Sequence, residues 1–139
     1  MIADYNTMPE MFWKCNYEYF DDKLPTPRYR LLHSYNILGR IEWYFEKKVP
    51  KRITLRMSDY FDFDEQTFRN IMVHEMIHYQ LLLSGADTKA KHGEAFLAKA
   101  QEMNEKYGLN ITVHIDARNF PLSPTAPKRS WWRCLQLCN

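Results

Sequence analysis

Two histidines and a glutamate stand at the spacing of a zinc hydrolase site. His74, Glu75 and His78 form an HExxH run. Residues four apart on an α-helix lie about 40° apart around the axis and roughly 6 Å along it, so both imidazoles can reach one metal ion. Histidine is a common zinc ligand, and the carboxylate beside it can take a proton from a water on that ion. The run therefore predicts a catalytic zinc ion with Glu75 as the general base.

A catalytic zinc site needs a third protein ligand and keeps one position open for water. We favour His92, which lies fourteen residues beyond the HExxH run, after a short polar loop that reverses the chain. Glu94 is a carboxylate alternative of the thermolysin-like kind, and His114 is a more distant histidine. The metzincin pattern fails, because it needs a glycine and a third histidine where this chain has Leu81 and Ser84.

The chemistry expected from these residues is hydrolysis of an amide bond. Zinc would polarise the scissile carbonyl, and Glu75 would deprotonate the attacking water and carry the proton to the leaving amine. A stabiliser for the oxyanion is also expected. The candidates of suitable side-chain type are Tyr35, Tyr79, His114 and Arg118.

A core helix is predicted to carry the HExxH run. A capping signature over residues 62–65 opens this helix, and Gly85 ends it. Its apolar residues surround the helix almost completely, which is typical of a core position. They are Phe68, Ile71, Met72, Val73, Met76, Ile77, Leu81, Leu82 and Leu83. Burying histidines and a carboxylate there without partners would be costly, so a shared metal ion explains the pattern better than chance.

Two further helices and a small sheet complete the predicted fold. A capping-box sequence that begins at Thr7 precedes a first helix over residues 8–20, and a third helix is expected to begin at His92 and end at Gly108. Strands are expected over residues 28–32, 37–45, 52–57 and 111–115. The fold class is therefore α+β, with three main helices and a small, mostly antiparallel sheet.

The length and composition of the whole chain predict the kind of protein that carries this site. Its 139 residues fit one domain with a core, and no apolar stretch approaches the roughly 18 residues that a membrane span needs. The first residues lack the basic and then apolar order of a secretory signal, so we expect a cytoplasmic protein that is not in a membrane. Cys15 is then expected to be a free, buried thiol, and the protein to be a monomer.

Several motifs make the chain similar to the SprT-like metallopeptidases, a family that includes a protease of DNA–protein crosslinks. They are Asn16-Tyr17-Glu18-Tyr19-Phe20, Leu38-Gly39-Arg40, Ile53-Thr54-Leu55, the HEMIH run, His92-Gly93-Glu94-Ala95-Phe96, Asn110-Ile111-Thr112-Val113 and Trp131-Trp132-Arg133-Cys134. The resemblance implies a zincin-like metalloprotease core over residues 1–120. It also implies one catalytic zinc ion on His74, His78 and His92, with Glu75 catalytic, in a cleft open to a protein or peptide substrate.

The basic tail over residues 121–139 is a separate region of interest. Residues 116–139 carry four basic and one acidic side chain, whereas residues 1–115 carry fifteen basic and sixteen acidic ones. Basic residues interleaved with tryptophans could contact single-stranded DNA, although the tryptophans could equally pack on the core. The candidate contacts are Lys128, Arg129, Trp131, Trp132 and Arg133.

Two cysteines of the tail resemble the first half of a zinc-ribbon-like element. Cys134 and Cys138 lack a second Cys or His pair before Asn139, and two thiolates cannot close a structural zinc site. The sequence could be truncated, the pair could be vestigial, or ligands could come from elsewhere.

Three functions therefore compete. The first is a zinc-dependent endopeptidase of SprT-like type that acts on proteins, including DNA-associated ones. The second is a DNA- or protein-binding module with a structural zinc ion and little or no proteolysis. The third is a hydrolase of small amides or esters, which a narrow and closed cleft would favour.

Overall fold

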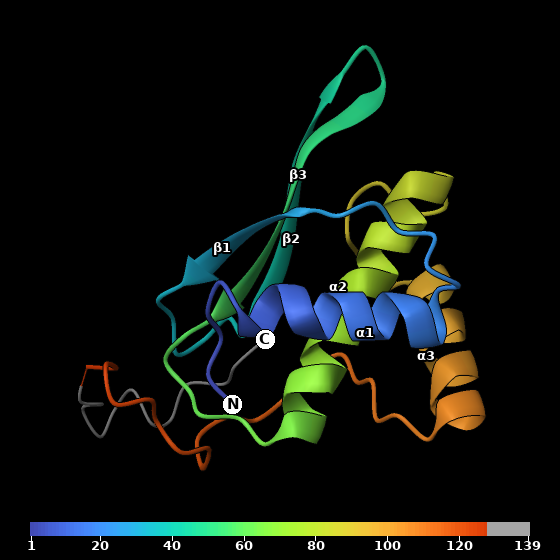
Figure 1. The fold of residues 1–139 in the computed structure, drawn as a ribbon. Helices are drawn as coiled ribbons and strands as arrows, with labels where there is room; N and C mark the ends of the chain where they lie inside the picture. The colour runs from blue at the N-terminus through green and yellow to red at the C-terminus, as the bar shows by residue number, and fades with distance from the viewer. Residues whose placement is uncertain (128–139) are drawn as a thin grey trace.

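The structure is a computed structural model that describes residues 1–127, and it has an α+β fold (Figure 1). The elements follow the order α1 (Thr7–Tyr19), β1 (Arg28–Leu32), β2 (Gly39–Glu46), β3 (Val49–Ser58), α2 (Glu65–Ser84) and α3 (Glu94–Tyr107). The predicted three helices and small sheet are confirmed. The finer expectation of a zincin-like core stays a prediction.

The sheet is mixed rather than mostly antiparallel, which corrects the prediction. Its strand order is β1-β3-β2, with β1 parallel and β2 antiparallel to β3. Residues 33–38 connect β1 to β2, and these two strands lie on opposite sides of β3, which occupies the centre of the sheet. β3 suits that position because Leu55 and Met57 are fully buried. Strand β2 consequently lies at an edge of the sheet, next to α2.

Helix α2 runs through the centre of the fold, as predicted for a core helix. The Asp64 carboxylate caps it by accepting from the Thr67 amide at 3.0 Å, and Gly85 ends it in the left-handed region at φ 77°. Twelve of its side chains are buried, which leaves little of it in contact with water. Helices α1 and α3 both pack on α2, which is also in contact with β2.

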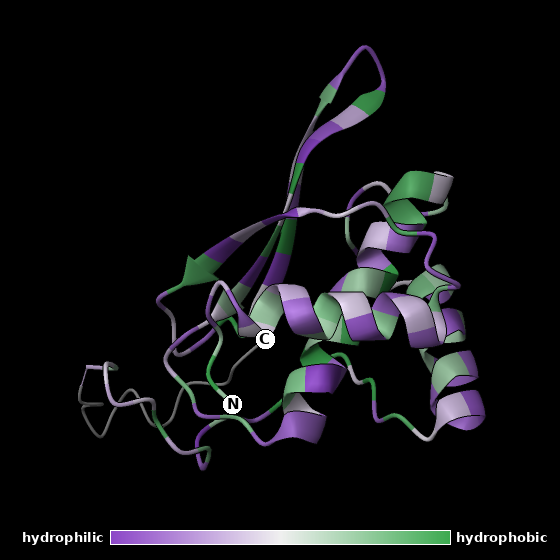
Figure 2. Cartoon of the chain, in the orientation of Figure 1, coloured by the Kyte–Doolittle hydropathy of each residue, from purple (hydrophilic) through white to green (hydrophobic). Residues whose placement is uncertain are grey.

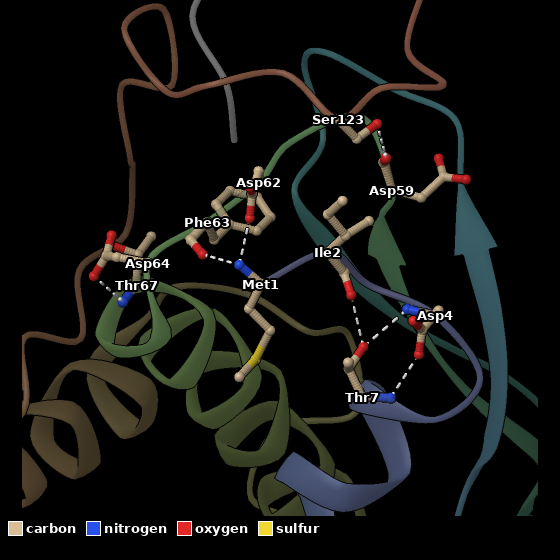
Figure 3. Close-up of polar contacts among 10 residues, drawn as sticks. All are labelled: Met1, Ile2, Asp4, Thr7, Asp59, Asp62, Phe63, Asp64, Thr67 and Ser123. Carbon is tan, nitrogen blue, oxygen red and sulfur yellow. Dashed lines mark hydrogen bonds and ion pairs between the residues drawn. The ribbon is translucent and has the colours of Figure 1, made fainter.

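The first helix begins differently from the predicted capping box. Thr7 lies inside α1, and the N-cap residue Asn6 makes no side-chain cap. Instead, the Asp4 carboxylate accepts from the Thr7 amide at 2.6 Å, and the Thr7 hydroxyl donates to the Ile2 carbonyl at 2.7 Å (Figure 3). The Asp4 carboxylate also accepts from the Asn6 amide at 2.8 Å. These bonds lower the pKa of Asp4. The Asp4 carboxylate, which lies before the helix, therefore accepts from the first helix amides in place of the Thr7 side chain.

The strand expected over residues 111–115 does not form. The Asn104 side chain occupies both backbone groups of Ile111, accepting from its amide at 2.7 Å and donating to its carbonyl at 3.1 Å. Such side-chain bonds compete with a strand ladder for backbone groups. The segment instead passes the middle of α2 as irregular chain, where the Thr112 carbonyl accepts from His74.

Past residue 120, the described chain stays attached to the core. Ser123 donates from its hydroxyl to the Asp59 carbonyl at 2.7 Å (Figure 3). Its amide donates to the Tyr60 carbonyl at 2.9 Å. The division between a core over residues 1–120 and a tail over residues 121–139 stays a prediction. The tail residues named above, from Lys128 to Cys138, lie outside the described residues.

Two expectations about the whole chain can be compared with residues 1–127. Cys15 is a free thiol that is fully buried, and burial raises its pKa to about 12. In this part of the chain no helix combines the length and the apolar character that crossing a membrane requires.

Candidate metal centre

Three imidazoles meet at one end of the cleft between α2 and β2. His74 and His78 project from the same wall of α2, and His92 approaches from the loop that precedes α3. The three ring centroids lie 5.0 Å from one another in every pair. One nitrogen from each ring falls within 4.8 Å of the others. We call these residues the histidine triangle.

The main chain fixes the orientation of one ring. The Nδ1 of His74 donates to the Thr112 carbonyl at 2.9 Å, so its Nε2 carries the lone pair. That Nε2 lies 3.0 Å from the Nε2 of His92. A carbonyl behind a ligating histidine is the usual way in which proteins orient such a ring. His78 differs, because its Nδ1 is buried without a hydrogen-bond partner among residues 1–127.

The triangle fits a tetrahedral metal ion. Three imidazoles bound at a zinc–nitrogen distance of about 2.0–2.1 Å place their ring centres about 5 Å apart, as they are here. Burial lowers the pKa of His74 to about 3 and that of His78 to about 4, and the pKa of His92 is also lowered by burial. All three rings are therefore neutral near pH 7, which is the form that binds a metal ion.

An aromatic ring from α3 forms the floor of the triangle. Phe96 is buried and stacks on His78, with ring centroids 4.6 Å apart and planes 23° apart. It also touches His74 at 4.7 Å and His92 at 4.9 Å between centroids. Phe96 thus shields the rear of the site from water and leaves the cleft side as the approach to the three nitrogens.

Glu75 lies beside the triangle and is almost completely buried. Its Oε1 is 3.9 Å from the Nε2 of His74. Burial raises the pKa of Glu75 to about 8, while the nearby Arg40 acts in the opposite direction. Gly39 makes this position possible, since a Cβ there would lie 3.1 Å from the Glu75 Cγ and 3.2 Å from its Oε1. Strand β2 can therefore approach the carboxylate only through a residue without a side chain.

The triangle and Glu75 open onto a cleft of about 350 Å³. One wall comes from β2 and the residue before it, and the other from α2 and the loops on either side of α3. The polar and aromatic residues of the cleft beyond the histidines and Glu75 include Arg40, Trp43, Asn70, Lys89 and Asn110. The cleft is partly open at its mouth, so a substrate can approach the triangle from solvent.

The other candidates from the sequence do not line the cleft, although His114 lies close enough for its charge to lower the pKa of His74 and His92. The group of possible ligands found among residues 1–127 consists of the histidine triangle and does not include Glu94 or His114. Of the suggested oxyanion stabilisers, Tyr79 donates to the Pro25 carbonyl at 2.8 Å, and Tyr35 packs on Tyr60. Arg118 is paired with Asp116 at the surface.

Sequence reasoning missed the contribution of β2 to the site. Gly39, Arg40 and Trp43 all line the cleft, although only the first two belong to a motif singled out above. The alternation of β2 could have indicated that Gly39, Ile41 and Trp43 share a face. That this face meets α2 at Glu75 depends on the packing of distant elements, which the alternation does not reveal.

Comparison with known proteins gives one match. The SprT-like family model matches residues 8–115, which includes every element from α1 to α3 and all of the histidine triangle. No curated protein matches the chain, and no solved structure does.

Proposed function

The chain belongs to the SprT-like family, and from this premise we propose that it is a zinc-dependent metalloendopeptidase. The observation that carries the proposal is the histidine triangle with Glu75 beside it on an open cleft. Family membership alone supports only a metallopeptidase-like domain. The geometry adds three neutral imidazoles with a common focus and a carboxylate within reach of it.

Each residue of the site has a separate role in the proposed hydrolysis. Zinc held by His74, His78 and His92 would polarise the scissile carbonyl and lower the pKa of a water molecule. Glu75 takes a proton from the attacking water and passes it to the leaving amine. The cation would bring down the raised pKa of Glu75, because an opposite charge favours the carboxylate. The apolar surroundings formed by Phe96 keep other water away from the ligands.

Arg40 is a basic residue of β2 at the cleft, where its guanidinium also pairs with the Glu42 carboxylate at 3.6 Å. It lines the cleft, and its charge is felt at Glu75. A guanidinium is always cationic, so it can stabilise negative charge on a substrate carbonyl or hold a substrate carboxylate. Arg40 thus takes the place of the tyrosine, histidine and arginine candidates that lie outside the cleft.

The alternative functions fit this site less well. A structural zinc site is closed by four protein ligands, whereas the triangle provides three and leaves one side open to the cleft. A hydrolase of small amides would suit a narrow and enclosed pocket. Action on DNA-associated proteins belongs to the proposal through the family resemblance and the basic tail.

Glu75→Gln is the experiment that tests the proposal. The amide keeps the shape of the side chain but cannot accept the proton, so cleavage of an unfolded protein such as casein should fall by about 10²–10⁴-fold. Zinc content, measured on the same samples, should stay at one ion per chain. Glu94→Gln is the matched control and should leave both quantities unchanged. Cleavage by a zinc-loaded Glu75→Gln protein at the original rate would refute the proposal.

A further inference from the structure

The β2–β3 hairpin extends well beyond the rest of the fold (Figure 1). Strand β1 pairs with β3 only from Thr54 to Ser58, so residues 44–52 form a two-stranded ribbon without a third strand. We call these residues the outer hairpin. An isolated hairpin gains little stability from packing. Its side chains are therefore available for a partner.

The outer hairpin concentrates positive charge. Lys47, Lys48, Lys51 and Arg52 are exposed, with Glu46 as the only acidic residue of the segment. The rest of residues 1–127 has the opposite balance, with twelve basic and sixteen acidic side chains. None of the four hairpin cations forms an ion pair with another residue described in the structure. Their charge is directed toward solvent.

Exposed aromatic rings lie beside these cations. Tyr44 and Phe45 are adjacent in β2 and are 46% and 47% exposed. Neighbouring strand residues point to opposite faces, so each face of the ribbon receives one ring. Phe45 also meets Trp43 edge-on, with centroids 6.4 Å apart, and Trp43 lines the cleft. The aromatic residues therefore continue from the cleft to the hairpin.

The turn of the hairpin is not built for stability. Lys47 and Lys48 have φ angles of 50° and 65° and join the paired residues Glu46 and Val49. Such two-residue turns favour Asn-Gly, because most side chains are strained in the left-handed region. Arg52 has the same strain, with a φ of 50°. Three of the four cations thus occupy positions where folding alone would favour other residues, as happens at functional sites.

We infer that the outer hairpin binds single-stranded nucleic acid. The four cations contact phosphates, while Tyr44 and Phe45 stack on bases, the combination that single-strand-binding surfaces use. Hydrophilic residues form the tip and hydrophobic residues lie next to it, so both kinds of contact are available along one short ribbon (Figure 2). An acidic peptide would satisfy the cations but would leave the exposed rings without a flat partner.

The position of the hairpin connects this surface to the cleft. A strand bound on Phe45 lies next to Trp43, and therefore next to the mouth of the cleft. Proteins attached to that strand would be held near Glu75. This connection rests on the proposed function, but the binding of nucleic acid does not, so a binding assay tests the inference even if the protein proves not to be a peptidase.

The decisive variant is Lys47→Asn with Lys48→Gly in the full chain. It installs the preferred turn, so the melting temperature should be equal or higher. Affinity for a fluorescent oligothymidine of about 20 nucleotides, measured by anisotropy, should nevertheless fall by about fivefold or more. The slope of log affinity against log salt should also decrease by about 1.4, the value for two phosphate contacts.

Lys14→Gln with Lys99→Gln removes the same charge from α1 and α3 and serves as the control. It should leave both the affinity and the salt slope nearly unchanged. The tail is present in every protein, so any difference between the two variants comes from the hairpin. Equal effects of the two variants, or no effect of either, would overturn the inference.

A second variant tests the rings. Tyr44→Thr with Phe45→Thr keeps residues that favour strands, and loss of stacking should weaken oligonucleotide binding by about tenfold without changing the salt slope. Undetectable binding of the full chain would overturn the inference. So would tighter binding to duplex DNA, to vesicles with anionic lipid or to a poly-glutamate peptide than to the oligothymidine at the same salt concentration.

Discussion

Helix α2 and the loop after it both contribute to the histidine triangle, but the two regions are held in place differently. His78 on α2 is 4% exposed and lies in a helix packed on three sides. His92 is exposed, in a loop that a few local contacts organise. The Asp87 carboxylate accepts from the Lys89 and Lys91 amides at 2.9 and 2.8 Å. The same loop holds Ala90 in the left-handed region at φ 51°.

This difference divides the site into two parts. The folding of the core sets the positions of His74, Glu75 and His78, so those positions persist as long as the protein is folded. The position of His92 depends on a small turn with few buried contacts, and such segments open at low energetic cost. We therefore expect metal affinity to respond to changes in the loop that leave folding untouched.

The largest expected effects come from removing a ligand on either side of this division. His78→Ala and His92→Ala should each weaken zinc binding by more than about a hundredfold, since even the groups that only hydrogen-bond to a ligand contribute about 10–100-fold. The two variants should differ in their free energy of unfolding, measured by urea titration of the metal-free proteins. His78→Ala should lose about 1 kcal/mol or more, whereas His92→Ala should stay within about 0.5 kcal/mol of the original chain. Equal losses of unfolding free energy would contradict the claim that folding depends more on His78 in the helix than on His92 in the loop.

Gly39→Ala tests the part of the site that α2 holds, without changing the loop that carries His92. The new Cβ would press on Glu75 and Ile71, and displacing the general base by a fraction of an ångström should lower kcat by about tenfold or more. Zinc affinity should not change, because no ligand moves. Gly93→Ala is a matched control beside His92, where an added Cβ meets nothing within 4 Å. A kcat equal to that of the control would show that β2 does not position the carboxylate.

Asp87→Ala examines the loop side and should have the smallest effect. It removes the two amide contacts that shape the loop and a negative charge that raises the pKa of His78 and His92. Both changes disfavour a cation, so zinc affinity in a chelator competition should fall by about tenfold. Asp116→Ala, which removes a surface carboxylate far along the chain, should have no effect. An Asp87→Ala protein with unchanged affinity would mean that the loop holds His92 without this carboxylate.

The parts of the site that the sequence predicts are those that depend on short-range pattern. The HExxH run, the Asp64 cap, Gly85 and the apolar surround of α2 all lie within one segment, and they predict α2 correctly and place His74 and His78 on it. His92 is chosen as the third ligand because it follows a short polar loop that reverses the chain after the HExxH run. The grouping of all three among the described residues agrees with that choice.

The features that escaped prediction depend on contacts between distant segments. The central position of β3 comes from the parallel pairing of β1 with β3, which no local pattern encodes. The strand expected over residues 111–115 is absent because the side chain of Asn104 takes its backbone groups. In the same way, the contact of Gly39 with Glu75 joins residues 36 positions apart in the chain.

The most direct test of the histidine triangle as a catalytic centre is X-ray absorption at the zinc edge of the loaded protein. The spectrum should show one zinc ion with three imidazole ligands, one further light atom and no sulfur. In His92→Ala, the imidazole count should fall to two in whatever fraction retains zinc. Zinc–sulfur scattering in a sample with one zinc ion per chain, or an unchanged imidazole count in His92→Ala, would contradict the assignment of His74, His78 and His92 as the ligands.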